Sequence, residues 1–302
     1  MSGYRLDTAL SEMLPNHSRS KISSWIKAGD ALIDQSQFKP KDKVNGSEII
    51  SLNIHEKSQS KWSPENIPLD IVFEDDDIIV INKHYGMVTH PGSGNWTGTL
   101  ANALLHYDSK LSRLDRAGIV HRLDKNTSGL MVVARNEKSQ KYLVEQLQNH
   151  SVDREYSAIV YGHMIAGGTV DEPIGRDPKD RVKQAVLMSG KEAKTHYRAI
   201  DRFKSHTHVK AILETGRTHQ IRVHLSHVGH SLIGDPMYGG RVRFPKKASE
   251  ELKDALVNFT RQALHSKKLT LTHPISGEIM SWKAPLPDDM LRLLEVLKKF
   301  DS

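Results

Sequence analysis

From residue 68 onward the sequence is a succession of short apolar segments with the length and alternation of β-strands. Several follow one another with too few residues between them for the helical crossover that joins parallel strands. The pattern therefore predicts a mixed α+β fold with a largely antiparallel sheet, in preference to a doubly wound parallel sheet. The expected strands lie at 70–73, 78–83, 129–135, 155–162, 193–200, 208–214, 263–271 and 277–285.

Helical patterns are fewer in the same region. A helix is indicated at 137–148 with Asn136 as its cap, and another at 218–228 with Thr218 as its cap. Further helices are expected at 249–258 and at the C-terminal end.

Residues 1–54 have a different organisation. Leucines recur at helical spacing over 6–14, and Ile22 and Ile26 lie on one face of a second helix. Alternating apolar residues at 50–54 then indicate a strand that follows a turn. The segment is predicted to be a small separate unit of two helices and a hairpin-like sheet.

Composition limits the classes of function. The 302-residue chain has a net charge of +7 and a pI near 9.3, which favours polyanionic partners without requiring them. It contains no cysteine, so disulfides, thiolate zinc sites and cysteine nucleophiles are excluded.

The N-terminus does not read as a targeting segment. Arg5, Asp7 and Glu12 interrupt what would be the apolar part of a signal peptide, and no apolar run reaches membrane-spanning length. We therefore expect a cytoplasmic protein that does not associate with membranes.

The stretch HRLDKNTSGL at 121–130 places one carboxylate, Asp124, in a polar loop directly before the apolar run LMVVA. A polar loop that leads into a buried strand is a common way to present a reactive side chain on a rigid scaffold. Taken alone, most aspartates in such loops only cap or close a turn.

Three motifs together resemble those of the RluA/RluD family of pseudouridine synthases: HRLDKNTSG, REYSAIVYG at 154–162 and GRTHQIRVH at 216–224. The resemblance is greatest to the bacterial branch that modifies 23S rRNA. It implies an isomerase that converts specific uridines to pseudouridine with an aspartate and without a metal or small-molecule cofactor.

The resemblance also implies roles for individual residues. Asp124 is the expected catalytic residue, and Tyr156 is expected to lie against the target base, where a phenol ring can stack on uracil. Arg222 is expected to pair with Asp124 and keep it ionised and oriented, with Arg217 as the alternative partner or a phosphate contact. Arg122 is expected to fill the space of a flipped uridine or to contact a phosphate.

The pattern over nearly all of residues 1–54 resembles the small S4-type RNA-binding module, in which basic helix residues face structured RNA. Arg19, Lys21 and Lys27 are the candidates here, although a solvated helix face has the same pattern. We expect an S4-type domain at 1–58, a linker at 59–67 and a catalytic domain at 68–302.

Two further motifs suggest sites that the chemistry does not require. His224 and His227 are three residues apart, but the helix offers no carboxylate at matching spacing, so no metal site is expected. The glycines of HPGSGNWTG at 90–98 do not form a nucleotide-binding fingerprint, and this segment is expected to be a loop near the RNA.

The resemblance thus implies an enzyme that acts on 23S rRNA or on an assembly intermediate of the large ribosomal subunit, and we expect a monomer. Two alternatives remain open. One is a ribosome-assembly factor that binds RNA without catalysis, and the other is an N-glycosidase that releases the base with the same carboxylate. Whether Asp124 attacks a sugar or base carbon, or removes a ribose proton, also stays open.

Overall fold

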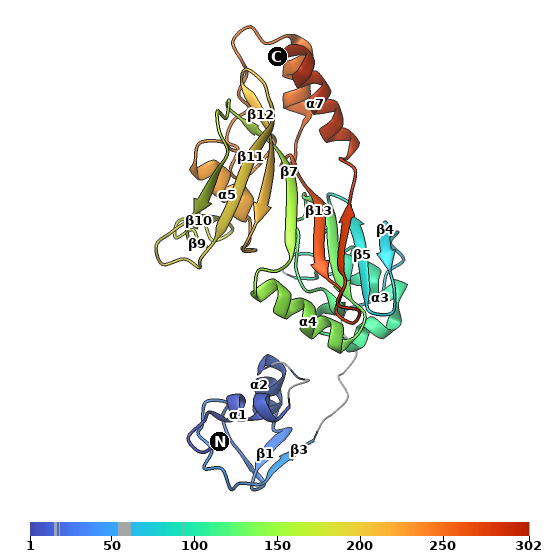
Figure 1. The fold of residues 1–302 in the computed structure, drawn as a ribbon, viewed down its shortest axis with the longest axis vertical. Helices are drawn as coiled ribbons and strands as arrows, with labels where there is room; N and C mark the ends of the chain where they lie inside the picture. Colours follow the sequence, from blue (N-terminus) through green and yellow to red (C-terminus); the bar gives the residue numbers. More distant parts are fainter. Residues whose placement is uncertain (15–16, 18, 54–61, 93, 302) are drawn as a thin grey trace. The chain divides into compact units, whose positions relative to one another are not determined.

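The computed structural model describes residues 1–14, 17, 19–53, 62–92 and 94–301, without the side chains of residues 20 and 21. The chain forms two compact units (Figure 1). One comprises Met1–Lys61 with Ser112–Leu114, and the other comprises Trp62–Leu111 with Asp115–Ser302. Among the described residues, no helix combines the length and apolar character needed to cross a membrane.

The N-terminal unit contains two helices and a three-stranded antiparallel sheet with strand order β2-β1-β3. Its core is formed by the apolar faces of both helices and the inner face of the sheet. The elements are α1 Leu6–Met13, α2 Arg19–Ala28, β1 Ala31–Ile33, β2 Ser36–Gln37 and β3 Ile50–Leu52.

The turn between β1 and β2 is formed by two residues with positive φ, Asp34 at 46° and Gln35 at 64°. Two left-handed residues in a two-residue hairpin loop match the twist of the strands, and glycine or asparagine usually supplies them. This hairpin therefore uses an Asp-Gln pair in a conformation that its sequence does not signal.

The larger unit is built on a nine-stranded sheet with the order β4-β5-β6-β13-β7-β12-β11-β8, with β14 paired to β13. Of the described strand pairs in this sheet, only β6 with β13 is parallel, as the prediction of a largely antiparallel sheet requires. The strands are β4 Ile71–Glu74, β5 Ile78–Lys83, β6 Ser128–Ala134, β7 Asp153–Tyr161, β8 Gly168–Asp171, β11 Lys194–Arg202, β12 His206–Leu213, β13 Leu264–Thr272 and β14 Ile279–Lys283.

Short elements connect and cover this sheet. Their bounds are α3 Leu100–Tyr107, the 3₁₀ segments Ser109–Arg113 and Asp115–Gly118, α4 Glu137–Gln148, the hairpin β9 Ile174–Arg176 with β10 Gln184–Val186, α5 Gln220–His227, α6 Glu250–Asn258 and α7 Asp288–Phe300. The four predicted helices are present, whereas α3, β8, β9 and β10 were not predicted.

Two helix caps show where local patterns succeed and fail. Asn136 caps α4 as predicted, because its side chain accepts a hydrogen bond from Ser139 N. The prediction of Thr218 as the cap of α5 is wrong. The cap position belongs to His219, which has a φ of 58° and makes no side-chain cap bond.

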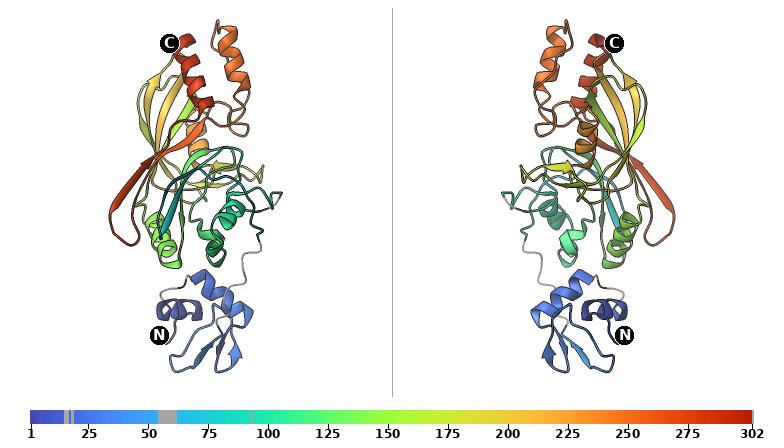
Figure 2. Two further views of the ribbon diagram at one scale, coloured as in Figure 1. Left: turned by 90° about the vertical axis from the view of Figure 1, so that its right-hand side faces the viewer. Right: turned by 90° about the vertical axis from the view of Figure 1, so that its left-hand side faces the viewer.

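Two apolar clusters hold helices against the sheet. One joins α4 through Leu143 to residues of β5, β6 and β13, including Leu130 and Leu269. The other joins α6 and α7 to Ile159 and Tyr161 of β7. Figure 2 shows α6 and α7, in orange and red, side by side at one end of this unit.

Residues 62–67, which the sequence places in a linker, make hydrogen bonds within the larger unit. The Asn102 side chain donates to the Ser63 carbonyl at 2.7 Å, and Gly98 N donates to the Glu65 carboxylate at 3.0 Å. Residues 59–61 of the predicted linker lie outside the described residues. The described part of the segment is thus fixed against the loop before α3.

Gly129 lies where β6 meets β13, directly after the HRLDKNTS segment. Its φ is 111°, and a Cβ atom at this position would lie 2.3 Å from the Ser266 carbonyl oxygen. The parallel pairing of the two strands therefore requires glycine here, because only a residue without a side chain allows this backbone approach.

We predict that Gly129→Ala lowers the free energy of unfolding by about 2 kcal/mol or more, because it combines an unfavourable φ with a backbone clash. Urea denaturation monitored by circular dichroism measures this. Gly92→Ala is the control, since a Cβ there meets nothing within 4 Å and its φ is not positive. Equal stability of the two variants would contradict the packing argument.

Candidate active site

The loop 123–127 between a 3₁₀ segment and β6 is held by hydrogen bonds to its backbone carbonyls. Four consecutive carbonyls each accept a bond from a separate donor. These are Thr89 Oγ1 to Leu123 at 2.8 Å, Thr127 N to Asp124 at 3.0 Å, Gly86 N to Lys125 at 2.9 Å and Arg261 Nη1 to Asn126 at 3.3 Å. Satisfied backbone groups of this kind fix the direction in which the Asp124 side chain leaves the loop.

Lys83, at the end of β5, lies behind this loop and is almost fully buried. Its Nζ donates to the carbonyls of His84, Met87 and Lys125 at 2.9, 3.0 and 3.3 Å. Burial lowers the pKa of Lys83 to about 7, although the nearby Asp124 carboxylate opposes that shift. The ammonium thus connects β5 to the residue that follows Asp124.

Asp124 is paired with Arg222 of α5. Arg222 Nη1 donates to Asp124 Oδ2 at 2.8 Å. The other edge of the same guanidinium donates to Asp235, with Nε to Oδ2 at 2.7 Å and Nη2 to Oδ1 at 2.9 Å. Arg222 therefore bridges two carboxylates and is fixed by a bidentate pair on the side away from Asp124.

Burial distinguishes the two carboxylates. The side chain of Asp235 is 0% exposed, and that of Asp124 is 16% exposed. Asp235 Oδ1 also accepts from Met237 N and Tyr238 N at 2.9 and 3.0 Å. The described polar contacts of the Asp235 carboxylate are thus with Arg222 and with two backbone amides of the protein, while Asp124 is partly exposed and lines the pocket.

Electrostatics keep this network ionised. Burial alone would lower the pKa of Arg222, but Asp235 and Asp124 raise it above its ordinary value. For Asp235, burial alone would raise the pKa, but the Arg222 hydrogen bonds lower it below the ordinary range. The site is thus built on a buried arginine that stays charged at any physiological pH.

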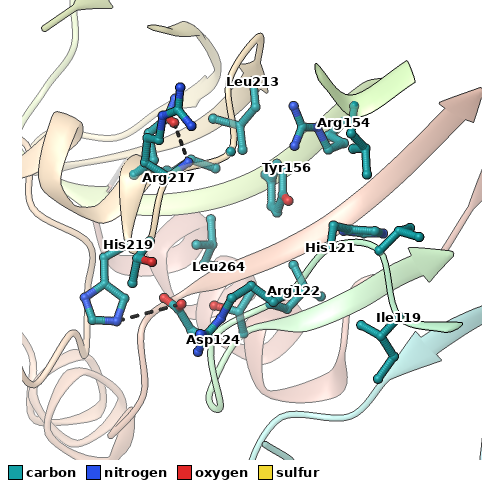
Figure 3. Close-up of a pocket in the computed structure, with 18 of the residues that line it drawn as sticks. Ile119, His121, Arg122, Asp124, Arg154, Tyr156, Leu213, Arg217, His219 and Leu264 are labelled. Carbon is teal, nitrogen blue, oxygen red and sulfur yellow. Dashed lines mark hydrogen bonds and ion pairs between the residues drawn. The ribbon is translucent and has the colours of Figure 1, made fainter. Parts of the chain in front are cut away.

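Asp124 lines a pocket of about 510 Å³ together with Tyr156, Arg222, Arg122 and Arg217. Figure 3 shows Tyr156 rising from β7 across the pocket from the Asp124 loop. The structure therefore brings the three predicted catalytic residues into one cavity. Tyr156 is buried, and burial raises the pKa of its hydroxyl, so the phenol is protonated at neutral pH.

Tyr161, five residues further along β7, lies in the apolar cluster with α6 and α7. Since side chains alternate along a strand, five positions place it on the face opposite to Tyr156. Tyr161 therefore packs in the core, while Tyr156 lines the pocket.

The predicted RNA-binding arginines and lysines have different surroundings. Arg122 is exposed at the pocket, and Arg217 Nε donates to the Glu192 carbonyl at 2.8 Å. In the N-terminal unit, Arg19 pairs with the buried Asp7 at 3.0 Å, and Lys27 is exposed. The prediction for the Lys21 side chain lies outside the described residues.

Three histidines of the segment 219–230, including His224 of the pair that suggested a metal, make separate contacts within the protein. His224 bonds Thr195 Oγ1 and the Glu172 carbonyl, and His230 bonds the Tyr161 carbonyl. His219 Nδ1 lies 2.9 Å from the Tyr238 hydroxyl, and its Nε2 lies 3.8 Å from Asp124 Oδ1. The ring of His219 thus adds a second neighbour to Asp124.

Elsewhere, Asp75, Asp77 and His273 have potential ligand atoms within 4.8 Å of one another. His273 Nε2 bonds Asp75 Oδ2 at 3.0 Å, and Asp75 Oδ1 accepts from the backbone of Asp77 and Ile78. These bonds close the turn between β4 and β5 and give the cluster a structural role.

A family model described as RNA pseudouridylate synthase matches residues 77–227, the part of the chain that carries Asp124, Tyr156 and Arg222. This chain belongs to that family. The match spans half of the chain, and it includes the loop, the strand and the helix that form the pocket.

Relatives of this synthase match nearly its whole length. It is 54% identical over 297 residues to ribosomal large subunit pseudouridine synthase D of Escherichia coli (strain K12), covering 98% of this chain and 91% of that protein. The protein of the same name from Xanthomonas campestris is 48% identical over 298 residues, covering 99% of this chain and 90% of that protein. The solved structure of human RNA pseudouridylate synthase domain containing 4 has a TM-score of 0.59 at 27% identity, covering 76% of this chain and 93% of that one.

Sequence reasoning missed several residues of the synthase site. Asp235, Lys83 and Arg154 all have buried side chains near Asp124, Tyr156 or both, and none stands in a residue pattern that signals catalysis. Asp235 offers one signal, since it is a lone carboxylate between Ile233 and Met237 in a glycine-rich turn. A charged residue in such apolar surroundings requires a partner.

We predict that Arg222→Met lowers the free energy of unfolding by about 3–5 kcal/mol, because it leaves Asp235 buried without its cation. Arg217→Met, in the same motif, is the control. We expect it to cost well under half as much, since Arg217 bonds a carbonyl near the surface. Urea unfolding of both variants gives the comparison, and equal losses would show that Arg222 does not hold the network.

Proposed function

We propose that this synthase converts specific uridines of 23S rRNA in the large ribosomal subunit to pseudouridine, with Asp124 as the catalytic residue. The RNA target is supported by the relatives at 48–54% identity, which are named for the ribosomal large subunit. Such an enzyme acts in the cytoplasm on rRNA or on a subunit assembly intermediate, as a monomer.

The arrangement of Asp124, Arg222 and Tyr156 in one pocket carries the proposal. Arg222 holds one oxygen of the Asp124 carboxylate at 2.8 Å. A carboxylate positioned in this way suits a reaction that breaks the bond between uracil N1 and ribose C1′ and rejoins C1′ to uracil C5. Arg222 is a positioning residue in this scheme, because it acts through Asp124.

Tyr156 supplies the wall against which the uracil is held. Its ring lies in the pocket, and a phenol ring can stack on the face of a pyrimidine while the detached base turns. Retaining the base in an enclosed site separates isomerisation from hydrolysis, in which the base would leave.

Arg122 and Arg217 provide positive charge at the pocket for the RNA backbone. A uridine in a stem-loop must leave its stack before C1′ is accessible. Arg122 is exposed and lies two residues before Asp124, so it can occupy the space left by the flipped base or bind a neighbouring phosphate.

The N-terminal unit is proposed to be an S4-type RNA-binding domain at residues 1–58, followed by the catalytic domain predicted at 68–302. Of the predicted linker 59–67, residues 62–67 belong to the larger unit. The two helices and the small sheet of the N-terminal unit support the S4-type assignment, as does the exposed Lys27 on α2. Arg19 and Lys21 are proposed to join Lys27 in RNA binding.

We predict that Asp124→Asn abolishes isomerisation and leaves RNA affinity within a few fold, because the carboxylate acts in chemistry while phosphate contacts dominate binding. Product analysis of 23S rRNA fragments and a filter-binding assay measure the two properties. Asp153→Asn, at an exposed carboxylate at the start of β7, is the control and should retain full activity.

Three outcomes of this assay, the last combined with analysis of cellular rRNA, would contradict the proposal. Turnover by pure Asp124→Asn protein would remove Asp124 from its role. Free uracil with an abasic site, formed by the wild-type protein, would indicate an N-glycosidase. Tight RNA binding without any product, together with unchanged pseudouridine in rRNA from cells that lack the gene, would indicate an assembly factor.

We also predict that a chain starting at Trp62 is a weaker enzyme with a little-changed maximal rate. Loss of phosphate contacts raises the enzyme concentration needed for a half-maximal single-turnover rate, and it flattens the salt dependence of binding by roughly one log–log unit per contact. Single-turnover rates at two salt concentrations measure both, after circular dichroism has confirmed that the shorter chain is folded. A collapsed maximal rate with unchanged affinity would show that the N-terminal unit helps to build the active site.

A further inference from the structure

Arg154 is a buried arginine of the pocket that the proposed chemistry does not use. It lies on β7, is 5% exposed and lines the same cavity as Asp124. Its Nη2 donates to the Glu214 carbonyl at 3.0 Å, whereas its buried Nε has no hydrogen-bond partner among the described residues. A buried cation with an unused donor requires an explanation.

No carboxylate in the described part of the chain forms an ion pair with Arg154. The side chain of its neighbour Glu214 is directed to His196 at 2.6 Å, and Asp124 is already bonded to Arg222. The residues that line the pocket include five arginines and a single carboxylate, that of Asp124. The charge of Arg154 is therefore not compensated by any described residue, which is costly for a buried group.

The surroundings of Arg154 hold its guanidinium in place. Leu213 lies directly opposite on β12, and the backbone of Gly216 passes close to the side chain. A Cβ on Gly216 would lie 2.6 Å from Arg154 Nη1, so the glycine leaves room for the guanidinium. The chain thus reserves space for a charged group at this end of the pocket.

Arg154 and Tyr156 are two residues apart on the same strand, so their side chains lie on one face, about 7 Å apart along β7. Figure 3 shows both at the pocket, with Leu213 nearby. If the target uracil lies on Tyr156, Arg154 reaches the sugar-phosphate backbone beside that nucleotide.

We propose that Arg154 binds a backbone phosphate of the RNA adjacent to the target uridine. This inference rests on the proposed function, in which Tyr156 holds that uridine. A phosphate supplies the missing negative charge and accepts two guanidinium bonds side by side, which a neutral uracil carbonyl does not. The cost of keeping Arg154 buried and unpaired in the free enzyme is then recovered when RNA binds.

The competing interpretation is that Arg154 only anchors the loop after β12 through the Glu214 carbonyl. That role predicts a loss of stability in Arg154 variants but no dependence on the charge of any particular phosphate. The test therefore uses RNA in which single phosphates are made neutral.

The experiment uses the full chain and a synthetic 23S rRNA stem-loop that the wild-type enzyme binds, with single methylphosphonates at each phosphate that flanks the target uridine. Dissociation constants are measured for the wild type, Arg154→Gln and Arg198→Gln. Arg198 is an exposed arginine of β11 that does not line the pocket, which makes it the charge-matched control.

We expect one methylphosphonate position to weaken wild-type binding roughly tenfold or more, the size of a lost charge-assisted contact. Arg154→Gln should bind the unmodified RNA about as weakly as the wild type binds the RNA with that methylphosphonate. The dissociation constant of Arg154→Gln should not change when that phosphate is made neutral. Arg198→Gln should keep the wild-type sensitivity. If Arg154→Gln does not fold, Arg154→Lys replaces it and should show a smaller loss at the same position than the wild type, since an ammonium keeps the charge but not the paired guanidinium bonds. Equal losses for Arg154→Lys and the wild type would count against the proposal.

Two results would overturn the proposal: wild-type binding that ignores every flanking methylphosphonate, or Arg154→Gln with sensitivity equal to that of the wild type. The RNA product distinguishes this failure from failure of the proposed function. If pseudouridine forms but the effect of the methylphosphonates does not depend on Arg154, only the phosphate contact is rejected. Release of uracil, or unchanged RNA, rejects the proposed reaction, while the binding data still report on Arg154.

Discussion

The guanidinium of Arg222 is the group on which the geometry of the site depends. It is buried, and it joins Asp235, which is fixed by two backbone amides, to Asp124, which faces the pocket. A buried ion pair of this kind contributes little to stability compared with an apolar replacement. Its role is to orient Asp124. The bidentate contact with Asp235 fixes the guanidinium, so that Nη1 lies at a defined place for the Asp124 carboxylate.

Asp124 is fixed from the backbone side as well. The carbonyls around it are bonded by donors from the β5 end, from the loop after it and from Arg261. The loop therefore needs little rearrangement when RNA binds, and binding energy can be used to extract the uridine from its stack. The rigid Asp124 loop and the arginines that line the pocket thus have different roles in the same site.

Much of the architecture was predictable because the strands have strong alternating patterns and the central ones are almost wholly apolar. The pocket residues Asp124, Tyr156 and Arg222 were predictable only because their motifs resemble a family. Asp235, Lys83 and Arg154 were missed, since their importance comes from contacts between segments far apart in the sequence. The Thr218 cap failed for a related reason: contacts of His219 with Tyr238 and Asp124 accompany a backbone conformation that local preference disfavours.

The position of β13 has a consequence for how the protein is made. β13 spans Leu264–Thr272 and lies between β6, which follows Asp124, and β7, which carries Tyr156. During synthesis, the two halves of the sheet cannot be joined until nearly the whole chain has left the ribosome. Pairings between segments so distant in sequence form slowly, because the intervening chain must first be ordered. A nascent chain without β13 thus holds the Asp124 loop and the strand of Tyr156 as separate pieces, so that the pocket forms only after β13 has been made.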